Sequence, residues 1–166
     1  MSVREQFTQE EWESVLQSPM LAGLAVTAAD PGGLWSAIKE GTGLARSVVE
    51  AKSNAAGTLL GEIGAAYETS EGRRTARDKV KEMLRGKKPA EVADAAVARL
   101  QEISAVVGAK APAQAPAFRD YLRKTAQQVA EAGTEGGFLG FGGEKVSAAE
   151  KKTLADIEQA LGGAAV

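Results

Sequence analysis

The chain has 166 residues, a formal net charge of −2 and a hydrophobic content of 44%, which together favour one folded domain over a disordered segment. It contains no cysteine and no histidine, which excludes disulfide scaffolds, thiolate zinc sites, cysteine nucleophiles, Ser-His-Asp catalysis and histidine-ligated haem or di-iron centres. Its 32 alanines and 19 glycines indicate closely spaced helices, because alanine is the best helix former and small side chains let helices approach.

The first expected helix begins at a capping box. Thr8 stands at the cap position and Glu11 follows three residues later, where its carboxylate can reach back to the cap. Phe7 and Trp12 occupy the positions of a hydrophobic staple. The pattern therefore predicts a well-specified helix start at this point.

Two proline signals divide the next part of the chain. The pair Ser18-Pro19 predicts a restart, with proline at a first helical position. The helix expected at 19–29 is apolar on most sides, which predicts a central, buried position. An Asp-Pro pair at 30–31 repeats the cap-plus-proline signal and opens a long helix expected at 31–52.

Four further helices are expected from apolar residues that recur at helical spacing. They are expected at 55–68, at 70–85 with Ser70 as the cap, at 89–107 and at 118–132. Two prolines in the Pro/Ala-rich stretch at 109–117 predict a linker between the last two.

The C-terminal part contains a glycine-rich loop at 135–146, followed by a second capping box from Ser147 to Glu150 that opens the final helix. No segment shows the alternation expected of a strand. The sequence therefore predicts an all-α fold, a compact single-domain array of seven or eight helices spanning residues 1–166.

The glycine-rich loop is the first candidate contact site. It places Phe138, Leu139 and Phe141 among five glycines. Exposed phenylalanine is usually avoided, so these side chains either pack onto the helices or contact a lipid, a protein partner or a second copy of the chain. Nucleotide-binding motifs are disfavoured, because charged residues follow the last glycine where those motifs require other residues.

The helix expected at 70–85 is the second candidate site. Residues 70–88 hold eight basic and three acidic side chains, a local charge of +5 that leaves −7 on the rest of the chain. Arg73, Arg77, Lys81 and Arg85 recur every fourth residue and so share one helix face. Such a face fits an anionic partner, or it is an ordinary solvated helix surface. Nucleic acid is the less favoured partner, because no aromatic residues interleave with the basic ones and the whole chain is acidic.

Two helix-turn segments share an outline. Residues 24–33 pass from one helix to another through a turn at Asp30, and residues 127–150 do so through Gly133 and the second capping box. This outline resembles the all-helical tellurite-resistance B-like family of bacterial proteins, over roughly a quarter of the chain. The resemblance implies a bacterial, stress-associated accessory protein with an acidic cation site, for which only Asp30 and Glu150 match. We expect no other metal ligands and no cofactor.

Three hypotheses about function remain open. The first is a non-enzymatic accessory or interaction protein that uses the apolar loop, with no catalytic residues. The second is an enzyme or small-ligand-binding protein with a pocket between helices, which would use Tyr67, Tyr121, Lys145 or carboxylates. The third is nucleic-acid binding through the basic helix.

The expected location is the cytoplasm. The most apolar run, at 19–29, has 11 residues, whereas a helix needs about 20 to span a bilayer. The first residues lack the long apolar core of a signal peptide. We therefore also expect no membrane span.

Overall fold

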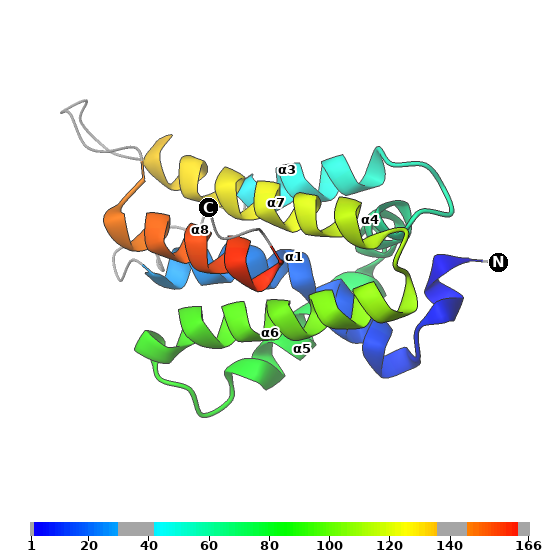
Figure 1. The fold of residues 1–166 in the computed structure, drawn as a ribbon, viewed down its shortest axis with the longest axis horizontal. Helices are drawn as coiled ribbons and strands as arrows, with labels where there is room; N and C mark the ends of the chain where they lie inside the picture. Colours follow the sequence, from blue (N-terminus) through cyan, green and yellow to red (C-terminus); the bar gives the residue numbers. More distant parts are fainter. Residues whose placement is uncertain (1, 30–41, 136–145, 163–166) are drawn as a thin grey trace.

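The computed structural model describes residues 2–29, 42–135 and 146–162, and over these ranges the chain is all-α, as predicted, with no strand (Figure 1). A short 3-10 helix, η1 (Val3–Gln6), precedes the α-helices. These are α1 (Gln9–Ala29), α3 (Thr42–Lys52), α4 (Leu59–Glu68), α5 (Ser70–Leu84), α6 (Pro89–Lys110), α7 (Ala115–Glu135) and α8 (Ala148–Ala160).

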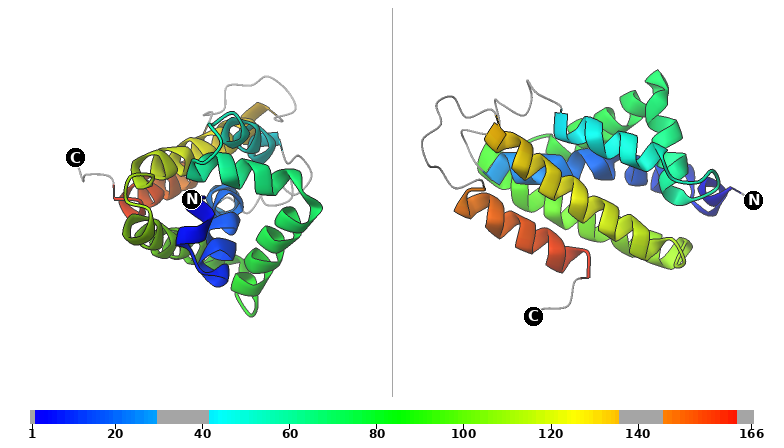
Figure 2. Two further views of the ribbon diagram at one scale, coloured as in Figure 1. Left: turned by 90° about the vertical axis from the view of Figure 1, so that its right-hand side faces the viewer. Right: turned by 90° about the horizontal axis from the view of Figure 1, so that it is seen from above.

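Helix α1 occupies the centre of the array. It packs against every other α-helix in the described ranges, most extensively α6, α5 and α7, and Figure 2 (left) shows it with the other helices around it. Val15, Leu21 and Val26 are completely buried along its length. The central position predicted for residues 19–29 is therefore correct, because a helix without a polar side can be covered on all sides.

The start of α1 confirms the first capping box. The Glu11 carboxylate accepts a hydrogen bond from the Thr8 amide at 2.8 Å, and the Thr8 hydroxyl accepts one from the Glu11 amide at 3.2 Å. The Phe7 and Trp12 rings pack with their centroids 6.3 Å apart, and both are buried. Local sequence alone determines this helix start.

The predicted restart at Pro19 is wrong, because α1 runs through this proline without a break. A proline inside a helix cannot donate to the carbonyl four residues earlier, which here belongs to Val15. The Ser18 hydroxyl donates to that Val15 oxygen instead, at 2.7 Å in the buried core. One side chain thus replaces the missing amide and lets the helix continue.

Helices α4 and α5 meet at a corner. The Thr69 hydroxyl accepts a hydrogen bond from the Gly72 amide at 2.9 Å, so Thr69, and not the predicted Ser70, caps α5. A side chain at Gly72 would place its Cβ 2.1 Å from the Ala66 carbonyl oxygen, so this corner requires glycine. The close turn leaves Ser70 as the first residue of the helix.

The predicted linker at 109–117 is shorter in the structure. Helix α6 continues to Lys110 and α7 begins at Ala115, so only residues 111–114 lie between them. Pro116 falls in the first turn of α7, where a missing amide breaks no intrahelical bond.

The second capping box is confirmed at the start of α8. The Ser147 hydroxyl accepts from the Glu150 amide at 3.2 Å, and the Glu150 carboxylate accepts from the Ser147 amide at 2.8 Å. Leu161 and Ile157 of the same segment are buried. Of the helix expected at 31–52, only the part from Thr42 lies in the described ranges.

Small residues occupy the places where helices approach most closely. Ala22 and Ala25 of α1, Ala51 of α3 and Ala126 of α7 are completely buried. At Gly64 of α4, an added Cβ would lie 2.5 Å from the Lys52 backbone nitrogen at the end of α3. No helix in the described ranges is long and apolar enough to cross a bilayer.

Candidate functional site: the basic face of α5

Helix α5 lies at the edge of the array, where it packs mainly on α1 and α4 (Figure 2). Gly72 and Ala76 are its buried residues, and Val80 and Met83 pack partly buried against the core. The opposite side of the helix faces away from these neighbours. A highly charged sequence folds in this way because one narrow apolar stripe is enough to hold a surface helix.

Arg73 fixes the corner from which α5 extends. Its guanidinium Nη1 donates to the Tyr67 carbonyl at 2.6 Å and to the Glu68 carbonyl at 2.9 Å, at the end of α4. The Tyr67 hydroxyl in turn donates to the Leu16 carbonyl of α1 at 2.6 Å. The two Arg73 bonds satisfy carbonyls at the C-terminal end of α4, which have no partner inside that helix. Together with the Tyr67 bond they connect α5 to the central helix α1 through α4. Arg73 therefore positions the helix and differs from the other predicted contact residues.

Four other basic side chains, on α5 and at its C-terminal cap, have no ion-pair partner among the described residues. We define the basic row as Arg74, Arg77, Lys81 and Arg85, all of which are exposed. No ion pair with a described residue engages any of the four. Lys79, on the inner side of the same helix, does have partners: its Nζ lies 3.4 Å from a Glu13 oxygen and 3.6 Å from a Glu82 oxygen.

Lys87 and Lys88 extend this positive surface beyond the end of α5. Both side chains are exposed, and neither pairs with an acidic group in the described ranges. Sequence reasoning singled out the residues at four-residue spacing and passed over Arg74, which lies three residues before Arg77 on the same surface. Because residues three apart are also neighbours on a helix surface, the spacing of Arg74 and Arg77 could have identified Arg74 from the sequence.

An acidic row runs beside the basic row. It consists of Glu71, Asp78 and Glu82, all exposed. At about 100° per residue, the basic row covers roughly 80° of the helix surface and the acidic row the next 40° or so. Each row is about 16 Å long at 1.5 Å per residue. The outward face of α5 therefore carries two parallel stripes of opposite charge.

Several predicted site residues lie outside the described ranges. They are Phe138, Leu139 and Phe141 of the apolar loop, Asp30 of the expected cation pair, and Lys145 of the expected pocket. The carboxylate of Glu150 accepts the Ser147 amide, so its role in the structure is capping. Within the described residues, no three acidic side chains lie close enough together to hold a metal ion.

The two tyrosines of the pocket hypothesis are buried. Tyr67 and Tyr121 are 4% and 3% exposed, so neither hydroxyl is presented to solvent. Burial raises the pKa of the Tyr67 hydroxyl, with a smaller contribution from Tyr121 nearby. Burial likewise raises the pKa of Tyr121 to about 12, while the nearby Ser47 and Thr125 hydroxyls oppose this effect. Both groups stay protonated at neutral pH.

A polar seam surrounds Tyr121 between α3 and α7. The Ser47 and Thr125 hydroxyl oxygens are 2.5 Å apart, and Thr125 donates to the Tyr121 carbonyl at 2.8 Å, so Ser47 is the donor of the first bond. The Tyr121 hydroxyl lies near this pair but without the alignment of a hydrogen bond. The seam is buried and serves packing between the two helices.

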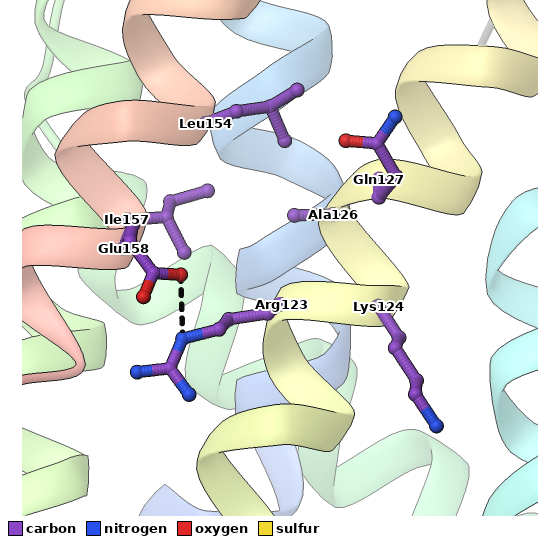
Figure 3. Close-up of a pocket in the computed structure, with 7 residues that line it drawn as sticks. All are labelled: Arg123, Lys124, Ala126, Gln127, Leu154, Ile157 and Glu158. Atoms are coloured by element: carbon purple, nitrogen blue, oxygen red, sulfur yellow. Dashed lines mark ion pairs between the residues drawn. The ribbon is translucent and has the colours of Figure 1, made fainter. Parts of the chain in front are cut away.

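A groove lies between α7 and α8, and Figure 3 shows its seven lining residues. Its volume is about 330 Å³. Ala126, Leu154 and Ile157 provide apolar surface, and Gln127 and charged residues complete the lining. Sequence reasoning did not find it, because its two sides lie about 30 residues apart in the chain.

The cations of this groove already have partners. Arg123 Nε lies 2.6 Å from a Glu158 oxygen, though without hydrogen-bond alignment, and Arg123 Nη1 donates to Asp120 at 2.7 Å. Lys124 Nζ lies 3.3 Å from a Glu50 oxygen. A small anion would have to displace these carboxylates, so the groove is a weaker candidate than the unpaired basic row.

Comparisons with known protein families, characterised proteins and solved structures found no match to this chain. The resemblance to the tellurite-resistance B-like family therefore stays a prediction from the outline of the sequence.

Proposed function

We propose that the protein is a non-enzymatic interaction module that binds an acidic partner protein through the basic row of α5. The observation that carries this proposal is a set of four exposed basic side chains, on α5 and its C-terminal cap residue, that form no ion pair with a described residue in a chain whose net charge is −2. Other exposed lysines of the described ranges do pair with carboxylates, as Lys52 does with Glu68 at 2.5 Å and Lys152 with Asp156 at 2.7 Å. Leaving a whole row unpaired keeps it available to a partner.

The strength expected of this contact is modest. Each exposed ion pair contributes about 0.2–1 kcal/mol, so the four members of the row supply a few kcal/mol together. The attraction is screened by salt, because the Debye length is about 8 Å at physiological ionic strength. The proposal therefore describes a transient, salt-sensitive complex in which charge mainly accelerates and orients encounter.

The acidic row favours a protein partner over nucleic acid. A duplex presents negative charge on all sides and would bring phosphates against Glu71, Asp78 and Glu82 as well as the basic row. Binding to single strands commonly uses aromatic stacking platforms. The aromatic side chains of the described ranges are buried, namely Phe7, Trp12, Tyr67, Phe118 and Tyr121. A partner of mixed charge avoids both difficulties.

Three sequence-based expectations accompany this proposal. They are a bacterial, stress-associated role, a cytoplasmic location, and a further contact or self-association through Phe138, Leu139 and Phe141. The first comes from the family resemblance and the third from the unusual exposure expected of phenylalanine. The α5 contact stands without any of them.

Binding to poly-glutamate tests the proposal. Fluorescence anisotropy of the labelled polymer is measured with the wild-type protein and with the triple variant Arg77→Gln, Lys81→Gln, Arg85→Gln. We expect wild-type binding at low salt and at least about a tenfold loss in the variant, since three contacts of about 0.5 kcal/mol each already amount to that factor. Glutamine keeps the helix propensity of the replaced residues.

A matched control removes the same charge elsewhere. Lys52→Gln, Lys110→Gln and Lys152→Gln change three exposed lysines that already pair with acidic groups. Binding should stay within about twofold of wild type, because these side chains are outside the basic row. An equal loss in both triple variants would overturn the proposal. Tighter binding to duplex DNA or RNA than to poly-glutamate would reassign the surface to nucleic acid.

A further inference from the structure

We infer that the preferred partner is an α-helix that carries an acidic row beside a basic one, complementary to the two rows of α5. This inference rests on the proposed function and deepens it, because it specifies the shape and charge pattern of the acidic partner. Its basis is the arrangement of seven exposed charges along α5 and its C-terminal cap residue. These are the basic row, Arg74, Arg77, Lys81 and Arg85, and the acidic row, Glu71, Asp78 and Glu82.

The spacing of the basic row matches that of a helix. Arg77 and Lys81 are one turn apart along α5, a rise of about 6 Å, and Arg85 follows after the same interval. Carboxylates at every fourth residue of a partner helix repeat at the same 6 Å or so and stay in phase along the row. Same-face residues of an extended strand repeat at about 6.6–6.8 Å, so over two intervals its carboxylates shift by about 1–2 Å relative to the row.

The acidic row makes the match selective. A uniformly acidic helix lying on the basic row would place its flanking carboxylates beside Asp78 and Glu82, and like charges in contact are destabilising. A partner with lysine or arginine on that flank gains attraction in both rows. Whichever side of the partner carries its basic row, one of the two helix orientations, parallel or antiparallel, brings unlike rows together.

The helix that presents these rows is anchored at its N-terminal end. The Thr69 hydroxyl caps its first turn, and the Arg73 guanidinium joins its base to the end of α4. Gly72 packs directly against the Ala66 carbonyl, so a larger residue at this position would not fit the corner. A preformed, oriented surface loses little entropy on binding, so its charge pattern can discriminate between partners.

A second copy of α5 is a poorer occupant. Two α5 helices side by side in parallel would also bring unlike rows together, since each carries both. However, the segment at 70–88 has a net charge of +5, so two such segments in contact repel each other. A net acidic partner helix has the same row pattern without this repulsion.

Two synthetic peptides of one composition and net negative charge, together with a proline variant of the first, test the inference by fluorescence anisotropy. The patterned peptide has glutamates along one helix face and lysines on the adjacent face. The scrambled peptide distributes the same residues evenly around the helix, and the third carries the pattern with a central residue replaced by proline. We expect the patterned peptide to bind at least about fivefold more tightly than either of the others.

A variant of the acidic row provides a second readout. Asp78→Asn with Glu82→Gln should reduce the preference for the patterned over the scrambled peptide to within about twofold, while raising affinity for poly-glutamate. Glu5→Gln with Asp94→Asn removes two exposed acidic charges elsewhere and should leave the preference unchanged.

The outcomes separate this inference from the proposed function. Equal binding of the patterned and scrambled peptides, with poly-glutamate binding still dependent on the basic row, would overturn the inference and leave the proposed function intact. Binding of neither peptide nor poly-glutamate would overturn both. A concentration-dependent dimer in analytical ultracentrifugation that the triple glutamine variant abolishes would assign the face to a second copy and reject the acidic partner helix.

Discussion

At the scale of single residues, the middle of α1 depends on a serine hydroxyl that takes the place of a missing backbone amide. Pro19 has no amide hydrogen, and the carbonyl it would have served, that of Val15, is completely buried with its residue. The Ser18 hydroxyl donates to this carbonyl at 2.7 Å. A buried carbonyl left without a donor costs about 1–3 kcal/mol, which is enough to end a helix that lacks such a replacement.

A double-mutant cycle tests this account. Ser18→Ala should lower the free energy of unfolding by about 1–3 kcal/mol, because it leaves the Val15 carbonyl unpaired. In a Pro19→Ala background the same change should cost at least about 1 kcal/mol less, since the new amide can donate to Val15. Urea unfolding followed by far-ultraviolet circular dichroism gives both values. Additive effects of the two changes would show that Ser18 and Pro19 act independently.

At the scale of elements, the close packing of α4 against α3 requires a position without a side chain. Helix α4 lies against the end of α3 at Gly64, where a Cβ would meet the Lys52 nitrogen at 2.5 Å and its Cα at 2.6 Å. Both neighbours are backbone atoms, so no side-chain movement can make room. The two helices must separate to accept even a methyl group.

Gly64→Ala should therefore destabilise the protein by about 1–3 kcal/mol, in spite of the better helix propensity of alanine. Gly108→Ala in α6 is the matched control. Its Cβ would meet only the end of the Arg119 side chain, at 3.2 Å, which can move. We expect that change to be neutral or to stabilise by up to about 1 kcal/mol. Thermal and urea unfolding measure the two, and the same sign for both would contradict the packing argument.

The elements also show what a sequence can and cannot predict. The capping boxes at Thr8 and Ser147 were predicted correctly, because every partner lies within three residues. The corner between α4 and α5 was not, because it depends on Arg73 reaching back to α4 and on Tyr67 donating to Leu16, 51 residues away. The restart predicted at Pro19 was wrong, because the Ser18 hydroxyl compensates for the missing amide by a hydrogen bond in the buried core of the folded protein.

At the scale of the whole molecule, the fold class and the central helix followed from composition and from the lack of a polar side at 19–29. The candidate site was predicted in part: the spacing of Arg77, Lys81 and Arg85 placed them together on the exposed side of α5. Which side of α5 is covered by α1 and α4 decides that the basic row is exposed and that Arg73 bonds to α4. Tertiary packing determines this side, so the local sequence pattern of α5 cannot predict it.

The two buried tyrosines make global stability sensitive to alkaline pH. A hydroxyl whose pKa is raised in the folded state stabilises the fold below its unfolded pKa of about 10, and this stabilisation is lost as pH rises. For Tyr121 the loss extends from about pH 10 to its folded pKa of about 12. The slope is about 1.4 kcal/mol per pH unit for each such tyrosine.

Tyr121→Phe should accordingly reduce the loss of stability between pH 10 and 12 by about that slope, while Tyr67 maintains its own contribution. Urea unfolding at a series of pH values measures both proteins, and the other titrating groups cancel in the comparison. Tyrosine absorbance near 295 nm follows ionisation directly. An identical pH dependence in the two proteins would show that Tyr121 ionises without opposing the fold.

The central position of α1 has a consequence for biosynthesis. This helix leaves the ribosome before its main partners, since α6 begins at residue 89 and α7 at residue 115. At about 5–20 residues per second, the apolar residues 19–29 wait several seconds for the helices that cover them. During that interval these residues lack most of the contacts that bury them in the folded protein.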